Sequence, residues 1–407
     1  MSKPKFTQGT GAYLFQWEEE AISIRIDRLY EDSKFNISCE VTILQGAGSH
    51  LHQARLNLTS TQARKSLAKV LQEREEHIDW YSLLEIACVR TLEAHRVGEP
   101  VYRLDEMKAT DRVKWRLEPL LVEGYPNLIY GPGGIGKSLL ATYFSLLIGL
   151  PYKQHNLNPE PGNVLILDWE FSGEETQERA DRLLSGMTGL TGAPIYYRFC
   201  WRPFADDIEE IRRTCMEKTI QMVVIDSAGP ACAGQPESAE ATLRFFTAFR
   251  ALHGITGLVI AHEAKNAAEK SPFGSVYWTN MARNVYKMQK DQDMESNKLN
   301  ISLVHKKANT GRLQRPMALQ FKFNTDGPIT VATTDINQNP ELSKGLPIKY
   351  QISQVLLNGA LGPEEIADTI DKKVDSVRVT LSRSPMFVAL GNGRWGLRAK
   401  ENTNAAG

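Results

Sequence analysis

Short apolar segments alternate with helical stretches through the middle of the chain. The main ones lie at residues 164–167, 222–225, 258–261 and 301–304. Strands that are apolar on both faces are typical of a parallel sheet covered by helices on both sides. Further apolar stretches at 285–288 and 317–323 are expected to extend this sheet. The pattern therefore predicts an α/β domain with a mainly parallel sheet over residues 105–332.

The first hundred residues follow a different pattern. Apolar and polar side chains alternate in two runs, which contain Ile22, Ile24 and Ile26, and then Phe35, Ile37, Cys39, Val41 and Ile43. This period of two predicts antiparallel strands, with a turn at residues 31–33. Helical spacing follows from Ser60 to about Glu93, so we expect a small α+β domain over residues 1–100. Its lysines and arginines at 65, 69, 74 and 90 are compatible with nucleic-acid contact, but charge on a helix face is usually only its solvated side.

A polar linker at residues 333–345 precedes a compact C-terminal unit over residues 345–400. Apolar spacing predicts three short helices, the third from Lys373 to Ser382, and then two strands around a glycine turn at 391–393. This order resembles a winged helix, a fold that binds DNA or serves as a protein docking module. If the unit binds DNA, its phosphate or base contacts are expected from Arg378, Arg383 and Arg394.

Composition limits the possible partners. Basic and acidic side chains number 48 each, which disfavours a protein that coats nucleic acid through a strongly basic surface. No apolar run approaches the length of a membrane helix and no apolar signal segment follows the first residues, so we expect a cytoplasmic protein without a membrane partner. The five cysteines are scattered without a CxxC pair, which favours buried thiols over disulfides or a zinc site.

The most specific motif is GPGGIGKS at residues 131–138, which fits the GxxxxGK[ST] pattern of a phosphate-binding loop between a strand and a helix. Glycines let the backbone approach phosphates, and the helix N-terminus adds positive charge. Lys137 is expected to neutralise the β and γ phosphates of ATP, and Ser138 to bind Mg²⁺. The predicted nucleotide-binding residues are Gly131, Pro132, Gly133, Gly134, Ile135, Gly136, Lys137, Ser138 and Leu139.

Two later strands end in carboxylates. Residues 222–226 form an apolar strand that ends at Asp226, as in a Walker B element that holds magnesium. The strand at 164–168 is followed by Glu170, at the same carboxyl edge of a parallel sheet, where α/β proteins bind ligands. Glu170 is therefore a candidate to position and deprotonate the attacking water. The alternative is a capping or surface carboxylate for the helix predicted at 173–185.

The order of these motifs resembles the RecA and DnaB superfamily, in which the glutamate after the intermediate strand is the catalytic base. Residues 105–325 resemble its RepA-like branch, the hexameric replicative helicases of plasmids, phages and related mobile elements. The segment LVIAHEAK at 258–265 is similar to the branch's strand ending in HHxxK, with Ala261 in place of the first histidine. The resemblance implies that His262 senses the γ-phosphate; a purely structural histidine is the alternative.

Two weaker segments complete the resemblance. Residues 274–283 are similar to the branch's GSxxxxxxxR, and residues 307–311 to its KxNxG. The second implies that Lys307, with Lys306 beside it, reaches the γ-phosphate of a neighbouring subunit; the alternative is that both lysines are simply solvated. The family further implies a ring-forming homo-oligomer, a hexamer, with loops at 228–238 and 265–273 that move along DNA.

The leading hypothesis is an ATP-hydrolysing motor, a replicative helicase with single-stranded or forked DNA as its partner and ATP and Mg²⁺ as its cofactors. Replication-loading proteins are further expected partners. Two alternatives stay open: a recombinase or filament-forming ATPase of the same fold, and a winged-helix DNA-binding regulator whose ATPase switches its assembly.

Overall fold

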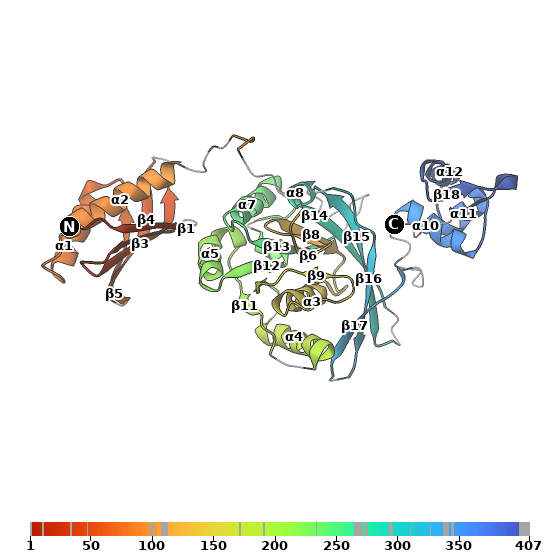
Figure 1. The fold of residues 1–407 in the computed structure, drawn as a ribbon, viewed down its shortest axis with the longest axis horizontal. Helices are drawn as coiled ribbons and strands as arrows, with labels where there is room; N and C mark the ends of the chain where they lie inside the picture. The colour runs from red at the N-terminus through yellow and green to blue at the C-terminus, as the bar shows by residue number, and fades with distance from the viewer. Residues whose placement is uncertain are drawn as a thin grey trace, which may run out of the picture. The chain divides into compact units, whose positions relative to one another are not determined.

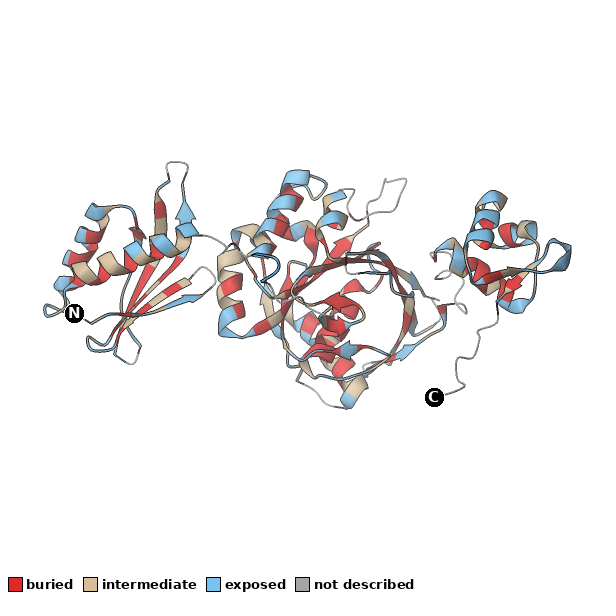
Figure 2. Cartoon of the chain, turned by 45° about the horizontal axis from the view of Figure 1, so that its top comes forward, coloured by how far each residue is buried: buried red, intermediate tan, exposed pale blue. Residues whose placement is uncertain are grey.

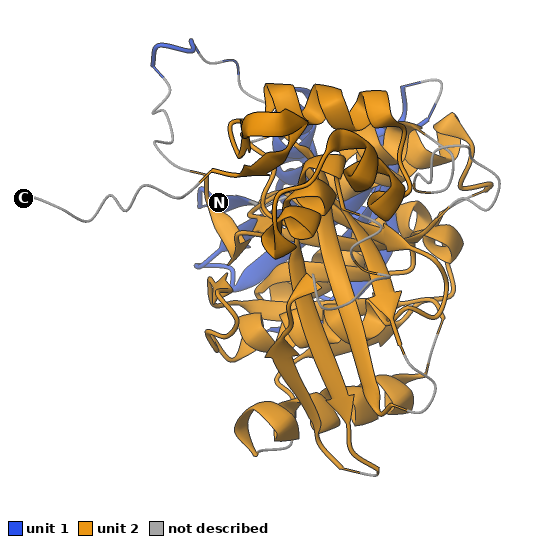
Figure 3. Cartoon of the chain, turned by 90° about the vertical axis from the view of Figure 1, so that its right-hand side faces the viewer, with its two compact units in different colours: residues 1–111 blue, residues 112–407 orange. Residues whose placement is uncertain are grey.

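A computed structural model describes residues 2–9, 12–32, 35–46, 48–97, 101, 103–106, 113–170, 172–189, 192–232, 234–263, 272, 276–292, 296–309, 311–325, 327–336, 342 and 346–398. The chain divides into two compact units, residues 1–111 and 112–407 (Figure 3). Within the described residues, no helix has the length and apolar character needed to cross a membrane.

The first unit is a five-stranded antiparallel sheet with two helices packed on it (Figure 1). The strands are neighbours in chain order: β1 (Lys5–Gly9), β2 (Ala12–Trp17), β3 (Ile22–Glu31), β4 (Ile37–Gln45) and β5 (Ser49–Asn57). Helices α1 (Thr61–Gln72) and α2 (Trp80–Val97) bury their apolar sides against the alternating apolar positions of these strands. The expected period of two is confirmed except at Phe35. That residue lies outside the strands with a φ of +62°, and its side chain is exposed.

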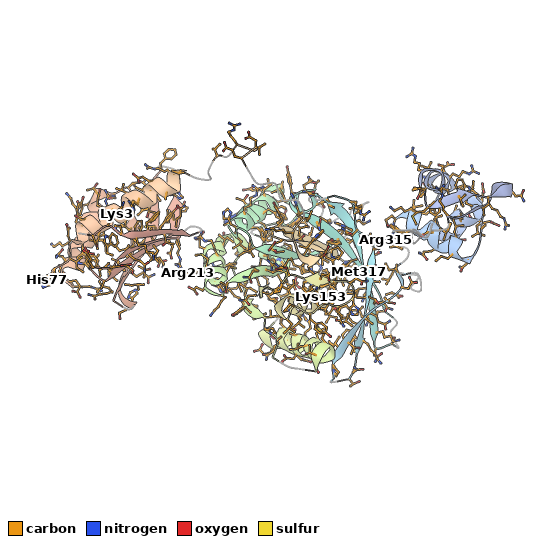
Figure 4. The ribbon with its side chains drawn as sticks, viewed as in Figure 1. Lys3, His77, Lys153, Arg213, Arg315 and Met317 are labelled. Atoms are coloured by element: carbon orange, nitrogen blue, oxygen red, sulfur yellow. The ribbon has the colours of Figure 1, made fainter. Side chains whose placement is uncertain are left out.

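The second unit is built on a nine-stranded sheet in the order β11-β10-β12-β13-β8-β14-β15-β16-β17. Six strands are parallel: β8 (Pro126–Gly131), β10 (Asn163–Asp168), β11 (Tyr196–Phe199), β12 (Ile220–Asp226), β13 (Thr256–His262) and β14 (Asn284–Asp291). Strands β15 (Lys298–Ala308), β16 (Met317–Phe323) and β17 (Ile329–Thr333) extend it in antiparallel fashion. Figure 4 marks Met317 at the start of β16. The predicted α/β core with a mainly parallel sheet is confirmed.

Helices cover both faces of this sheet, as its continuously apolar strands predict. Helices α3 (Lys137–Gly149) and α4 (Gly173–Thr188) pack on one face. The other face carries α5 (Ile208–Glu217), α6 (Ala228–Ala231), α7 (Ala239–Arg250) and α8 (Val276–Met281). Helix α3 is buried along almost its whole length, which explains its apolar sequence on every side (Figure 2). A small sheet of β6 (Trp115–Glu118), β7 (Leu121–Val122) and β9 (Asn158–Pro159) adjoins α3.

The C-terminal segment has its own small core. Helices α10 (Ile348–Val355), α11 (Pro363–Ile370) and α12 (Val374–Arg383) enclose Ile352, Ile366, Val377 and Leu381, together with Phe387 of the hairpin β18 (Phe387–Ala389) and β19 (Trp395–Leu397). The helices and the hairpin lie where the sequence predicts them. The winged-helix interpretation and the predicted domain boundaries remain predictions. Each of the five cysteines is a buried free thiol, as expected.

Candidate active site

The carboxyl ends of four parallel strands meet at one edge of the nine-stranded sheet. Asp168 and Asp226 are direct partners across β10 and β12, and His262 of β13 is the partner of Gly131 at the end of β8. Strand β13 lies between the strand that leads into the phosphate-binding loop and the strand that ends in Asp226. This order brings residues that are distant in sequence to the edge where α/β proteins bind ligands.

The phosphate-binding loop needs glycine for two reasons. Gly134 and Gly136 have φ angles of +66° and +88°, which favour glycine, and a Cβ on Gly131 would lie only 2.5 Å from the carbonyl oxygen of Met288. Gly136 is the N-cap of α3 and supplies no side-chain cap. The first N–H groups of this buried helix are therefore free of a side-chain cap, and a phosphate fits this arrangement.

Lys137 directs its ammonium group into the loop. Its Nζ donates to the carbonyl oxygens of Pro132 at 2.7 Å and Gly131 at 3.1 Å. The residue is buried, and burial lowers its pKa, although nearby carboxylates oppose this shift. The position fits the predicted role, because a bound phosphate would give the buried cation an anionic partner in place of two carbonyls.

Asp226 is a buried carboxylate beside the first turn of α3. Its pKa is raised to about 6, chiefly by burial and also by the charges of Glu170 and Asp168, while a hydrogen bond from Ser138 opposes the shift. A carboxylate and a hydroxyl next to a phosphate site suit Mg²⁺, which takes oxygen ligands from one or two protein groups, phosphates and water. Ser138 and Asp226 therefore fit the predicted metal site.

Glu170 follows β10 and is held by two neighbours. Ser227 donates a hydrogen bond to its Oε1, and Nε2 of His262 lies 3.7 Å from the same oxygen. The interaction with the nearby His262 side chain is the main reason that the pKa of Glu170 is lowered, so the carboxylate is ionised at neutral pH. The alternative capping role is wrong, because the N-cap of α4 is Ser172, whose side chain accepts from the N–H of Glu175.

Asp168 helps to position Glu170 through a hydrogen bond to its backbone. Its Oδ1 accepts the N–H of Glu170 at 2.8 Å, and its Oδ2 accepts weaker hydrogen bonds from Thr176 at 3.3 Å and Tyr197 at 3.5 Å. The carboxylate is therefore engaged in positioning. The sequence did not reveal these partners, nor Ser227, although the position of Ser227 directly after Asp226 was an available signal.

The ring of His262 lies between Glu170 and the phosphate-binding loop. A Cβ on Gly133 would be 3.9 Å from its Cε1, which places the imidazole within contact distance of the phosphate-binding loop as well as near Glu170. A histidine in this position can respond to what the loop binds, as the predicted sensor role requires.

Residues 96–268 match a family model described as an AAA domain. This segment is a P-loop ATPase domain. It contains the phosphate-binding loop, Glu170, Asp226 and His262. No curated protein sequence matches the chain. Among solved structures, a KaiC-like protein of the archaeon Pyrococcus horikoshii OT3 is similar, with 16% sequence identity and a TM-score of 0.40. The match covers 54% of this chain and 99% of that chain.

Lys307 lies beyond the matched part of the ATPase domain and away from its phosphate-binding loop. It pairs with Val285, which pairs with Leu128 of β8, so it lies roughly 10 Å below the end of β8 at about 3.3 Å per residue. Its Nζ donates at 2.8 Å to three carbonyl oxygens at the end of α8, those of Thr279, Asn280 and Ala282. Lys307 is therefore not simply solvated, and the structure does not bring it to the phosphate site of its own subunit.

The three predicted DNA-binding arginines are exposed on the C-terminal segment. Arg378 forms an ion pair with Glu364, and Arg394 lies 4.0 Å from Glu365. Exposed ion pairs contribute at most about 1 kcal/mol, so a DNA phosphate can compete for these arginines.

The first part of one of the two loops expected to contact DNA is packed in the structure, and DNA contact by this loop stays a prediction. Segment 228–238 begins with helix α6, whose Ala228 and Ala231 are buried, and the carbonyl of Pro236 accepts a hydrogen bond from Trp278. The first part of this segment is therefore packed into the core, because its small apolar residues fill space beside β13. The second predicted loop, 265–273, lies outside the described residues except for Pro272.

Proposed function

We propose that this protein hydrolyses ATP to drive movement on single-stranded DNA, as a ring-forming motor of the replicative-helicase type. The observation that carries the proposal is the Glu170 carboxylate, ionised and held by Ser227 and His262 at the edge where the phosphate-binding loop begins. A carboxylate that is ionised and fixed in place suits the activation of water for attack on a phosphate.

Each residue of the site has a separate role in the proposed hydrolysis. Lys137 neutralises charge on the phosphates, and Glu170 orients the water and accepts its proton. Ser138 and Asp226 hold Mg²⁺, which offsets charge on the phosphate oxygens when it is bound. His262 lies between Glu170 and the loop, where it registers the presence of the γ-phosphate.

The ring is proposed from the position of Lys307. Because β15 runs antiparallel to β14, its end is carried away from the subunit's own phosphate-binding loop. A cation there serves hydrolysis only if it acts on a neighbouring subunit, which favours ATP binding between subunits. Its partners within the chain are three neutral carbonyls, and a phosphate is the stronger acceptor.

An unwinding assay on forked DNA tests the proposal. The protein is expected to separate the strands with ATP and Mg²⁺, whereas the Lys137→Ala variant is expected to leave the fork intact. Exchange of homologous strands without unwinding would identify the recombinase alternative. Sequence-specific binding to duplex DNA, with neither activity, would identify the regulator; either result would overturn the helicase proposal.

A further inference from the structure

Glu263, the residue after His262, forms a buried ion pair with Lys287. Nζ of Lys287 is 2.7 Å from Oε1 of Glu263, and the side chains are only 13% and 8% exposed. Glu263 follows the end of β13, and Lys287 belongs to β14, so the pair spans β8, which lies between these strands. Because β8 runs straight into the phosphate-binding loop, the ion pair crosses the sheet at the base of the ATP site.

Backbone contacts hold Glu263 in place. Its N–H donates to the carbonyl oxygen of Gly131 at 3.1 Å, and it forms an isolated antiparallel bridge with Pro272. Consecutive residues of an extended chain point to opposite faces of a sheet. His262 faces Glu170 and the loop, whereas Glu263 faces Lys287, so anchoring Glu263 also fixes the backbone that carries His262.

We propose that the Glu263–Lys287 ion pair is the positioning element that holds His262 against Glu170 and the phosphate-binding loop. The inference rests on the proposed hydrolytic role of Glu170 and adds two positioning residues to it. Removing one partner of a buried pair leaves the other charge uncompensated and forces local rearrangement. At this position, the rearrangement displaces the end of β13.

Because Lys306 lies near the ion pair, replacing Glu263 and replacing Lys287 are expected to have different effects. Lys306 is close enough to the pair that Lys287 contributes to lowering its pKa, after burial, and Glu263 opposes the shift. Without Glu263, Lys287 and Lys306 both lose a nearby acid, whereas without Lys287, Lys306, two residues beyond the β15 partner of Lys287, still compensates Glu263 in part. Glu263→Gln is therefore expected to be more harmful than Lys287→Met.

The experiment is a double-mutant cycle with His262, read in the rate of ATP hydrolysis and in ATP affinity. Glu263→Gln is expected to lower kcat about tenfold and to change ATP affinity less than about twofold. In a His262→Ala background, the same substitution is expected to lower kcat less than about twofold, because residues that act through one another are not additive. An equal loss in both backgrounds would overturn the proposal.

Two further variants separate positioning from general stability. The exchange Glu263→Lys with Lys287→Glu restores opposite charges and is expected to recover kcat relative to Glu263→Gln; no recovery would count against the pair. Arg116 and Glu123 form a similar partly buried pair at 2.6 Å in the same unit. Glu123→Gln is expected to lower the melting temperature without energetic coupling to His262. If Glu263→Gln does not fold, the Lys287→Met and His262→Ala cycle answers the same question, and additive losses there would overturn the proposal.

Turnover by Glu170→Gln separates the positioning role of the ion pair from the catalytic role of Glu170. If Glu170→Gln retains normal turnover, the assignment of the base is wrong whatever the cycle shows. If Glu170→Gln loses turnover while the effects of Glu263→Gln and His262→Ala are independent, the positioning role alone is wrong.

Discussion

Nε2 of His262 lies 3.7 Å from Oε1 of Glu170, the same carboxylate oxygen that accepts a hydrogen bond from Ser227. These residues come from three neighbouring strands of the parallel sheet or from the positions just after them. Ser227 also follows Asp226 directly, so the proposed base and the proposed metal ligand are joined through one residue. Under the proposed roles, this link connects the residue that orients the water to the residue that holds magnesium.

Replacing Lys137 by alanine is expected to weaken ATP binding at least about tenfold, because the substitution removes a charge-assisted partner of the phosphates. Titration with a fluorescent ATP analogue measures the change. Lys153, an exposed lysine beyond α3, supplies the matched control, and Lys153→Ala is expected to bind like the wild type. Equal affinities for all three proteins would remove Lys137 from the site.

Asp226→Asn is expected to stabilise the nucleotide-free protein at pH 8. Burial raises the pKa of Asp226 from 3.8 to about 6. One pH unit corresponds to about 1.4 kcal/mol, so keeping this carboxylate ionised above pH 6 costs the folded state roughly 3 kcal/mol. The cost grows as pH rises from about 4 to 6, because the unfolded state loses its proton first.

Calorimetry of the wild type and Asp226→Asn at each pH checks this prediction. The melting temperature of the variant is expected to exceed that of the wild type at pH 8, and the difference is expected to shrink toward pH 4. Mg²⁺ and ATP together are expected to stabilise the wild type more than the variant. A difference that does not depend on pH would show that the buried charge is not its cause.

Mixing two inactive variants tests whether Lys307 acts across the subunit interface. A Lys307→Ala subunit keeps Glu170, and a Glu170→Gln subunit keeps Lys307. If the active site lies between subunits, some sites in a mixed ring therefore combine Glu170 from one subunit with Lys307 from its neighbour. ATP hydrolysis is expected to return in part on mixing. A mixture as inactive as its components would contradict action between subunits. Sedimentation must show that each variant assembles, because Lys307→Ala also removes three hydrogen bonds to the end of α8.

The double substitution Arg378→Ala and Arg383→Ala is expected to weaken DNA binding and to flatten its dependence on salt, because fewer counterions are released. Glu364→Gln offers the opposite control: it frees Arg378 from its acidic partner and is expected to strengthen binding. ATP affinity should remain unchanged in both variants. An unaltered salt slope in the double variant would favour a docking role for the C-terminal segment.

The sequence predicted the parts of the site that belong to single strands and loops. The phosphate-binding loop, Glu170 and Asp226 each lie at the end of an apolar strand or within two residues of it, so periodicity, the GxxxxGK[ST] motif and motif order were sufficient to place them. The contact of His262 and Ser227 with one oxygen depends on strand order, which no local pattern contains.

The environment of Lys307 depends on tertiary structure in the same way. Its contacts with the end of α8 follow from the antiparallel pairing of β14 and β15, which has a register shift beside Val285. Neither the pairing nor the shift is visible in the spacing of residues. The buried pair of Glu263 and Lys287 could not be foreseen for the same reason, because β8 separates the two strands in the sheet.

Glu170 is proposed to activate the water that attacks ATP. The decisive test of this role is single-turnover hydrolysis by Glu170→Gln, with ATP affinity measured on the same preparation. ATP is expected to bind Glu170→Gln with nearly unchanged affinity while hydrolysis slows at least about a hundredfold, within the range for loss of a general base. Near-normal hydrolysis by Glu170→Gln would show that Glu170 does not activate the water.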